Sequence, residues 1–292
     1  MTIIKSIKKK YDIKDSFYNG KVMDPEQRLF LSDNFVIKLY FPKKYKYYFN
    51  ELEVYRHLYD KEYIPTLYFN GEEENYKYIV LQKENGKSLF DSWDSLSKVE
   101  KIGYLKDIAI MLKDINNIKS GRVDFRNYVN NEFYHSMDCI NFSASSLKKI
   151  NEIYNDNICY INNDEKSSLI HIDTHFYNFM INDDKKLIAY DFEHTINAPI
   201  DYQLVRLYRM NYYPESFIYP KNSLSSEQIE TYNIILPTII KNYSELIDFK
   251  NVENRLKIYL LNYLLREIIR CDINEDTAMK IISENAKIKL RG

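Results

Sequence analysis

The spacing of apolar residues changes near residue 90, and this change limits the folds open to the chain. Residues 27–41 and 66–82 each carry two apolar runs around a turn signal, a pattern that predicts β-hairpins. Between them, residues 47–60 place apolar side chains near one face of a helix. Beyond residue 90 the apolar residues recur at helical spacing. Helices are predicted there at residues 97–118, 201–213, 225–247, 252–271 and 274–290.

This order of patterns predicts an α+β fold with two lobes. A small β-rich N-terminal lobe would span residues 1–86, and a larger helical C-terminal lobe would span residues 87–292. The two would join at a hinge at about residues 82–86. A chain of 292 residues is long enough for each lobe to have its own core.

Charge and composition exclude several classes of protein. The formal net charge is −1, so we expect no nucleic-acid partner and no attraction to a membrane surface. The chain has no apolar run of about 18 residues and no apolar stretch behind its basic start that would indicate a secretory signal. Its three cysteines lie far apart, which favours a reducing compartment. We therefore expect a cytoplasmic protein, with the residue bias of an AT-rich bacterial genome and an oligomeric state that stays open.

Polar residues interrupt the apolar runs at a few places. Lys38 lies inside the strand pattern "FVIKLY" and needs a partner, because an unpaired buried charge is costly. The next helix offers Glu51 and Glu53. The second lobe carries a denser set within "LIHIDTHFYNFMIND" and after it: His171, Asp173, Asn178, Asp191 and Asp201.

Phosphoryl transfer requires side chains of these types. A lysine neutralises phosphate oxygens, a glutamate holds the lysine, an aspartate takes the hydroxyl proton, and an asparagine with a second aspartate binds Mg²⁺. Each residue alone has a plainer interpretation. Lys38 would more often be a strand lysine whose ammonium reaches solvent, His171 a hydrogen-bonded core histidine, and Asp191 a turn or helix cap. Their joint order and spacing favour phosphoryl transfer.

Three motifs resemble one branch of the protein-kinase-like superfamily, the aminoglycoside phosphotransferases and choline kinases. That branch carries a His-x-Asp-x4-Asn loop, a strand ending in Asp-Phe/Leu-Glu, and a further aspartate about ten residues on. "HIDTHFYN", "YDFEH" and "APIDYQL" are similar to these in turn. Upstream, "VIKLY", "FNELEVYRHL" and "YIVLQKENGKSL" resemble the lysine strand, the glutamate helix and the adenine-binding hinge. Together the matches run from about residue 30 to 205.

The resemblance implies a role for each matching residue. Asp173 would be the catalytic base, with His171 bracing the catalytic loop, and Asn178 and Asp191 would bind Mg²⁺. Lys38 would contact the α/β phosphates of ATP or GTP and pair with Glu51. Backbone groups of Gln82 and Glu84 would bind the base, with Leu81 as gatekeeper. Asp201 would fix local structure.

The sequence departs from the branch at four places, and the first is His175, which is unusual two positions after Asp173. Ile172 replaces the usual glycine between the histidine and the aspartate. No glycine-rich phosphate loop is visible, and Gly20 is its only candidate. Asn116 replaces a histidine that usually ends the helix after the hinge.

The acceptor is expected to be a small hydroxylated molecule. Residues 1–90 carry 16 basic and 13 acidic side chains, and the remainder carries 25 and 29. The second lobe is therefore mildly acidic, which favours a cationic acceptor such as an aminoglycoside, an amino sugar or a choline-like amine. Tyr208 and Tyr212 could offer ring faces to a cation, and Glu193 and His194 could face the acceptor.

Other functions remain open on the sequence alone. The chain could be a nucleotide-binding pseudokinase with a regulatory role. It could also be a metal-dependent hydrolase, because on a strand "HIDTH" would place His171, Asp173 and His175 on one face, with Asp191 and His194 nearby. A protein kinase is disfavoured, since only ten residues separate Asp191 from Asp201 and leave no activation segment.

Overall fold

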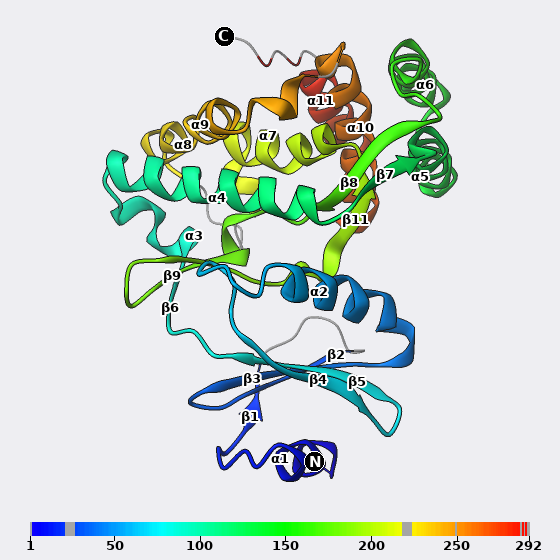
Figure 1. Cartoon of the computed structure of the whole chain (residues 1–292). Helices are drawn as coiled ribbons and strands as arrows, with labels where there is room; N and C mark the ends of the chain where they lie inside the picture. The colour runs from blue at the N-terminus through cyan, green and yellow to red at the C-terminus, as the bar shows by residue number, and fades with distance from the viewer. Residues whose placement is uncertain are drawn as a thin grey trace. The chain divides into compact units, whose positions relative to one another are not determined.

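The structure is a computed structural model that describes residues 2–20, 27–217, 224–248 and 250–286, together with residues 288 and 290. The chain forms two compact units, and it passes between them three times (Figure 1). Unit 1 comprises Met1–Ile118 and His171–Ile196, and unit 2 comprises Lys119–Ile170 and Asn197–Gly292. The two units are defined by which residues pack together. The predicted boundary at residue 86 was placed at the hinge between the lobes, and it stays a prediction. None of the described helices is both long and apolar enough to span a bilayer.

Unit 1 is built on a five-stranded antiparallel sheet with the strand order β1-β2-β3-β5-β4. Both predicted hairpins are confirmed, since β2 pairs with β3 and β4 pairs with β5 in antiparallel register. The third pairing, β3 with β5, joins the two hairpins. The strands are β1 (Tyr18–Asn19), β2 (Gln27–Leu31), β3 (Phe35–Tyr40), β4 (Leu67–Glu73) and β5 (Tyr76–Gln82).

The two faces of this sheet carry different residues because strand side chains alternate. Ile37 and Leu39 of β3 pack with isoleucines of helix α1 (Thr2–Lys10) in one buried cluster. Lys38 and Tyr40 point to the opposite face, where both reach helix α2 (Tyr45–His57). Figure 1 shows α1 below and α2 above the sheet. The polar side of β3 therefore faces α2.

A second, three-stranded sheet in unit 1 pairs the strand that follows the predicted hinge with two strands from later in the chain. Strands β6 (Gly86–Ser88), β9 (Phe179–Asn182) and β10 (Leu187–Ala189) pair in the order β10-β9-β6. A Cβ atom at Gly86 would lie 2.2 Å from the carbonyl oxygen of Ile181, so only glycine lets β6 approach β9 this closely. Helices α3 (Leu89–Ser92) and α4 (Lys98–Ile118) complete the unit, and α4 confirms the helix predicted at residues 97–118.

Unit 2 is mainly helical and is organised around one long buried helix, α10 (Val252–Arg270). Strands β7 (Ser120–Val123) and β8 (Glu165–His171) pair in antiparallel register, in a three-stranded sheet ordered β11-β8-β7 with β11 (Thr195–Ala198). The other helices are α5 (Phe125–Cys139), α6 (Ala144–Ile158), α7 (Leu204–Tyr212), α8 (Ser226–Tyr232), α9 (Ile235–Asn242) and α11 (Glu275–Asn285).

A buried ionic cluster holds together three elements of unit 2. Arg255 of α10 is 2% exposed, and its Nε donates to Asp201 Oδ2 at 2.5 Å. Its Nη1 donates to Glu165 Oε1 of β8 at 2.6 Å and to the carbonyl of Tyr160 at 3.0 Å. Burial raises the pKa of Asp201, although Arg255 beside it acts in the opposite direction. Asp201 thus binds Arg255 inside the helical unit.

Candidate functional site

Lys38 lies between two carboxylates in unit 1. Its Nζ donates to Glu51 Oε1 of α2 and to Asp191 Oδ1, each at 2.8 Å. The Glu51 side chain is fully buried, and the hydroxyl of Tyr40 donates to its second carboxylate oxygen. The sequence thus pairs a strand lysine with the first of the two candidate glutamates. Asp191, 153 positions further along the chain than Lys38, joins the same cluster.

Burial and charge act against each other in this cluster. Burial disfavours the charged form of Lys38, but Asp191 and Glu51 outweigh it and raise the pKa of Lys38 well above its ordinary value. Burial also opposes ionisation of Asp191, yet the ammonium of Lys38 holds the pKa of Asp191 below its ordinary value. For Glu51 burial prevails and raises the pKa. Lys38 and Asp191 are therefore held as an ion pair at neutral pH.

The loop after β8 folds back on itself and fixes Asp173. Strand β8 ends at His171, and the short 3-10 helix η3 (Phe176–Asn178) follows. Asn178 Nδ2 donates to the carbonyl oxygen of Asp173 at 2.9 Å and lies 3.3 Å from its Oδ2. His175 Nε2 lies 3.3 Å from the same Oδ2. The Asp173 carboxylate is thus held in place by two side chains from its own loop.

Asp191 is connected to this loop through the backbone. The N–H of Tyr190 donates to the carbonyl of Asn178 at 3.1 Å, so the residue before Asp191 is bonded to Asn178. Asp191 itself has φ 69° and ψ 53°, the left-handed conformation, and it precedes the 3-10 helix η4 (Phe192–His194). The structure therefore brings Asp173, Asn178 and Asp191 together, and Lys38 with Glu51 joins them through Asp191.

His171 lies at the base of the loop and is almost fully buried. Its ring packs against Phe192 with the centroids 5.3 Å apart. Within the described residues, neither ring nitrogen has a hydrogen-bond partner. Burial lowers the pKa of His171 to about 4. A neutral ring in this position supports the loop by packing.

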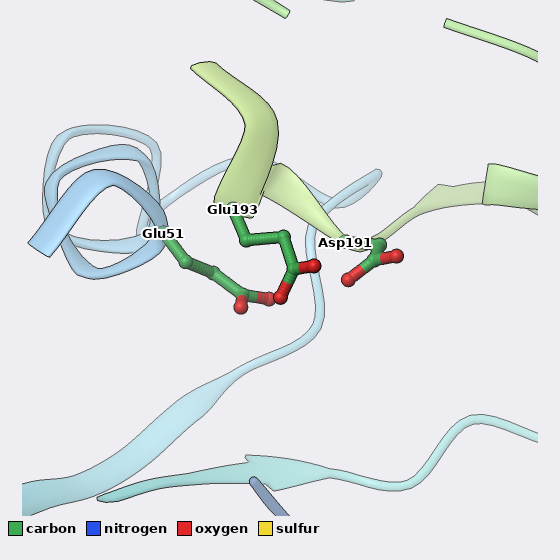
Figure 2. A group of neighbouring side chains, drawn as sticks. All are labelled: Glu51, Asp191 and Glu193. Atoms are coloured by element: carbon green, nitrogen blue, oxygen red, sulfur yellow. The ribbon is translucent and has the colours of Figure 1, made fainter. Parts of the chain in front are cut away.

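The strand interpretation of "HIDTH" is wrong. Strand β8 ends at His171, and the residues after it form a turn in which Asn178 bonds to Asp173. Side-chain alternation therefore stops before Asp173. Among the described residues, the group of three close side chains that could hold a metal ion is Glu51, Asp191 and Glu193 (Figure 2), and it contains no histidine. Figure 2 shows these carboxylates converging from α2 and from the segment after β10.

The predicted hinge residues follow β5. Leu81 is buried, and its role as gatekeeper stays a prediction. The N–H of Gln82 donates to the carbonyl of Thr66 at 2.8 Å, and that of Lys83 donates to Asn34 at 2.9 Å. Asn182 of β9 lies 3.4 Å from the carboxylate of Glu84. Two of the backbone N–H groups at the hinge are thus bonded within the chain.

The predicted acceptor residues fall into two places. Glu193 and His194 belong to unit 1, where His194 Nε2 lies 3.3 Å from Glu193 Oε1. Tyr208 and Tyr212 belong to α7 in unit 2, where their rings pack 4.6 Å apart. Tyr208 is buried and Tyr212 is exposed. Arg209 lies over the ring of neighbouring Tyr213 at 4.4 Å, so a cation of the chain itself covers that ring.

The structure also describes two positions at which the sequence departs from the branch. Gly20 donates its N–H to the carbonyl of Leu29 at 2.7 Å. The rest of the phosphate-loop candidate, residues 21–26, lies outside the described residues. Asn116 is buried near the end of α4.

Two residues that contact Glu51 or the segment after Asp191 were not predicted from the sequence. Tyr40 could have been found, because it lies two residues after Lys38 and therefore on the same face of β3. Asn50 of α2 donates to the carbonyls of Glu193 and Thr195. No side-chain pattern reveals it, because both of its partners are backbone groups.

Comparison with known proteins gives matches at the level of structure. No protein-family model matches the sequence, and no curated protein does so. The crystal structure of aminoglycoside phosphotransferase APH(4)-Ia matches with a TM-score of 0.66 and 17% identity, over 98% of both chains. ADP-bound aminoglycoside phosphotransferase APH(2'')-Ib matches at 0.65 and 16%, over 99% of this chain and 97% of the other. The chain has the aminoglycoside phosphotransferase fold.

Choline kinase LicA from Streptococcus pneumoniae has the same phosphotransferase fold. It matches with a TM-score of 0.58 and 16% identity, over 98% of this chain and 99% of the other. The match spans nearly the whole chain in each case. It confirms the predicted α+β fold and its resemblance to the phosphotransferase and choline kinase branch.

Proposed function

We propose that this chain is a Mg²⁺-dependent phosphotransferase that moves the γ-phosphate of ATP or GTP to a hydroxyl of a small molecule. The observation that carries the proposal is the position of Lys38. It binds Glu51 and Asp191 at once, and Asp191 is linked through Tyr190 to the loop that holds Asp173 and Asn178. Phosphoryl transfer depends on this set of side chains acting together.

Lys38 and Glu51 would act on the nucleotide. The ammonium of Lys38 would turn from Asp191 toward the α and β phosphates while Glu51 keeps hold of it. Tyr40, which bonds the other oxygen of Glu51, would keep that carboxylate in place. At the hinge, the N–H groups of Gln82 and Lys83 are already bonded. The carbonyl of Gln82 and the N–H of Glu84 would therefore bind the base.

Asn178 and Asp191 fit the requirements of a Mg²⁺ ion. Asp191 stays ionised because its pKa is lowered. The amide nitrogen of Asn178 faces Asp173, so its amide oxygen is left to act as a ligand. Carboxylate and amide oxygens suit this hard cation. An ion held there supplies positive charge against the β and γ phosphates.

Asp173 would take the proton. As the acceptor hydroxyl bonds to the γ-phosphorus, the bond to the nucleoside diphosphate breaks and the hydroxyl proton passes to the Asp173 carboxylate. Asn178 and His175 hold that carboxylate before the reaction begins. The acidic balance of residues 91–292 and the carboxylate of Glu193 favour a cationic acceptor, such as an amino sugar or a choline-like amine.

A thermal-unfolding titration with Mg-ATP and Mg-GTP tests the proposal. At 100 times the Kd, a ligand stabilises the folded state by about 2.7 kcal/mol, which corresponds to a rise of several degrees in Tm. We expect a metal-dependent rise that Asp191→Asn abolishes and that Asp184→Asn, at an exposed turn, retains. Asparagine tolerates the left-handed backbone, so Asp191→Asn isolates the charge.

A screen of hydroxylated amines then separates an enzyme from a pseudokinase. Amino sugars, choline, ethanolamine and nucleosides are added with Mg-ATP, and release of ADP is followed. Release that depends on the acceptor supports transfer. Nucleotide binding with no such release would favour the pseudokinase. No metal-dependent rise in Tm with either nucleotide would contradict the phosphotransferase itself.

A further inference from the structure

One face of α2 is directed at the segment that follows Asp191. Tyr47, Asn50 and Glu51 lie three and four residues apart, and Tyr55 follows one turn after Glu51, so these side chains share that face. The ring of Tyr47 packs against His194 at 5.1 Å, and that of Tyr55 packs against Phe192 at 5.5 Å. Glu51 holds Lys38, which in turn binds Asp191.

Asn50 lies on this face and bonds to the backbone of the same segment. Its Nδ2 donates to the carbonyl of Glu193 at 3.0 Å and to that of Thr195 at 2.9 Å. Glu193 belongs to η4 and Thr195 begins β11, so this one amide group binds the backbone on both sides of the junction between the two elements.

The carbonyl between these two is held from elsewhere. The oxygen of His194 accepts a hydrogen bond from the N–H of Ile172 at 3.2 Å. Three successive carbonyls, of residues 193 to 195, are thus bonded in turn to α2, to the catalytic loop and to α2. These hydrogen bonds hold the backbone after Asp191 from two sides, by α2 and by the loop that follows β8.

We propose that Asn50 is a positioning residue for metal-dependent nucleotide binding. This inference rests on the proposed function, because it assigns to Asn50 the task of holding the segment after Asp191 against the helix that carries Glu51. Asparagine suits the task because its NH₂ group provides two N–H donors from one atom. Serine offers one donor, whereas an ionised aspartate offers none and would place a negative charge against both carbonyls.

Loss of the Asn50 amide should weaken the part of nucleotide binding that depends on the metal ion. Without Asn50, the carbonyls of Glu193 and Thr195 lose this donor, and residues 193–195 are held less tightly. The distance of Asp191 from Lys38 and Asn178 is then less well defined. The hinge lies elsewhere on the sheet, at the end of β5, and keeps its own hydrogen bonds. Nucleotide bound without metal should therefore be affected little.

Calorimetric titration with ATP, in EDTA and in saturating Mg²⁺, measures this difference. The gain in affinity that Mg²⁺ brings to the wild type should fall about tenfold in Asn50→Ala, with affinity in EDTA within about twofold. Asn50→Ser should be intermediate, and Asn50→Asp at least as impaired as Asn50→Ala. The control is Asn151→Ala on α6, where the amide bonds its own helix at Leu147, and it should behave as wild type.

Each other outcome contradicts the inference. An unchanged effect of Mg²⁺ in Asn50→Ala would overturn it and leave the proposed function standing. An equal loss of affinity in EDTA and in Mg²⁺ would show a purely structural role and also overturn it. A wild type that does not bind Mg-ATP overturns both proposals. If Asn50→Ala does not fold, Asn50→Ser decides by the same measurement.

Discussion

His171 makes the stability of the chain depend on pH in a defined range. Its folded-state pKa of about 4 lies below the ordinary value of 6.5, so the unfolded chain takes up the proton first as pH falls. The stability from the neutral ring is fully present above about pH 6.5 and is lost toward about pH 4. Between pH 7 and pH 5 this amounts to about 2 kcal/mol.

Replacing the ring tests this dependence. His171→Phe keeps an aromatic ring against Phe192 and removes the titrating group. Urea unfolding at pH 7 and at pH 5 should show a fall in the free energy of unfolding that is about 2 kcal/mol smaller in the variant than in the wild type. If the free energy of unfolding fell equally in the two proteins, His171 would take up its proton as readily in the folded chain as in the unfolded one, which would contradict the prediction.

At the scale of residues, sequence reasoning succeeded where a buried charge needs a partner. Lys38 in an apolar strand had to be paired, and Glu51 is its partner. Of the two interpretations of "HIDTH", the loop is confirmed and the strand is wrong, because local hydrogen bonds from Asn178 to Asp173 favour a turn over a continuing strand. Tyr40 is one of 28 tyrosines, so its position two residues after Lys38 did not stand out. The roles of Asp173, Asn178 and Asp191 stay predictions until tested.

At the scale of elements, the pairing of β6 with β9 depends on Gly86. A Cβ there would meet the carbonyl oxygen of Ile181 at 2.2 Å and the Cα of Asn182 at 2.8 Å, and both are backbone atoms. Gly86→Ala should therefore lower the free energy of unfolding by about 1–3 kcal/mol. Gly103→Ala in α4, with nothing within 4 Å of the new methyl, should raise it by about 0.5–1 kcal/mol. Urea unfolding compares the two, and a Gly86→Ala variant as stable as wild type would rule out the close approach.

Helix boundaries show where periodicity alone falls short. The pattern at residues 225–247 reads as one helical stretch, yet the chain forms α8 and α9 with a break at residues 233 and 234. Pro237 explains the break. Proline has no N–H to donate and is tolerated in the first turn of a helix, so α9 begins two residues before it. The hairpins and α4 were predictable because turn residues and a capping pair mark their ends.

At the scale of the whole molecule, the order of segments couples the two units. Unit 1 is completed by His171–Ile196, which the chain reaches only after Lys119–Ile170 of unit 2. We therefore expect a single unfolding transition. Trp93, the one tryptophan of the chain, is buried in unit 1 and reports on that unit by fluorescence.

A substitution that destabilises unit 2 should consequently also lower the unfolding midpoint measured by the fluorescence of Trp93. Arg255→Met leaves Asp201 and Glu165 buried without their cation, which costs about 3–5 kcal/mol. The urea midpoint followed by fluorescence should fall together with the midpoint followed by circular dichroism. The control, Arg122→Ala, breaks an exposed pair with Asp164 and should cost about 0–1 kcal/mol. A fluorescence midpoint that stays in place while the other falls would mean that the units unfold independently.

The sequence also predicted the fold at this scale, because the motifs follow one another in the order of the phosphotransferase branch. The limits of the compact units were not predictable, since they depend on how α4 and residues 171–196 pack. The lobe boundary at residue 86 stays a prediction. The acceptor stays one too, because an excess of four acidic side chains over some 200 residues is a weak preference for a cation.

The left-handed backbone at Asp191 bears on how such a chain could evolve. Asparagine and glycine adopt that conformation as readily as aspartate, so either could replace Asp191 without strain. Mutational drift in a lineage that no longer needed the charge would find these two exchanges open and would leave the architecture intact. The backbone therefore gives no reason for a carboxylate at this position. The ion pair with Lys38 does give one, because it requires the charge.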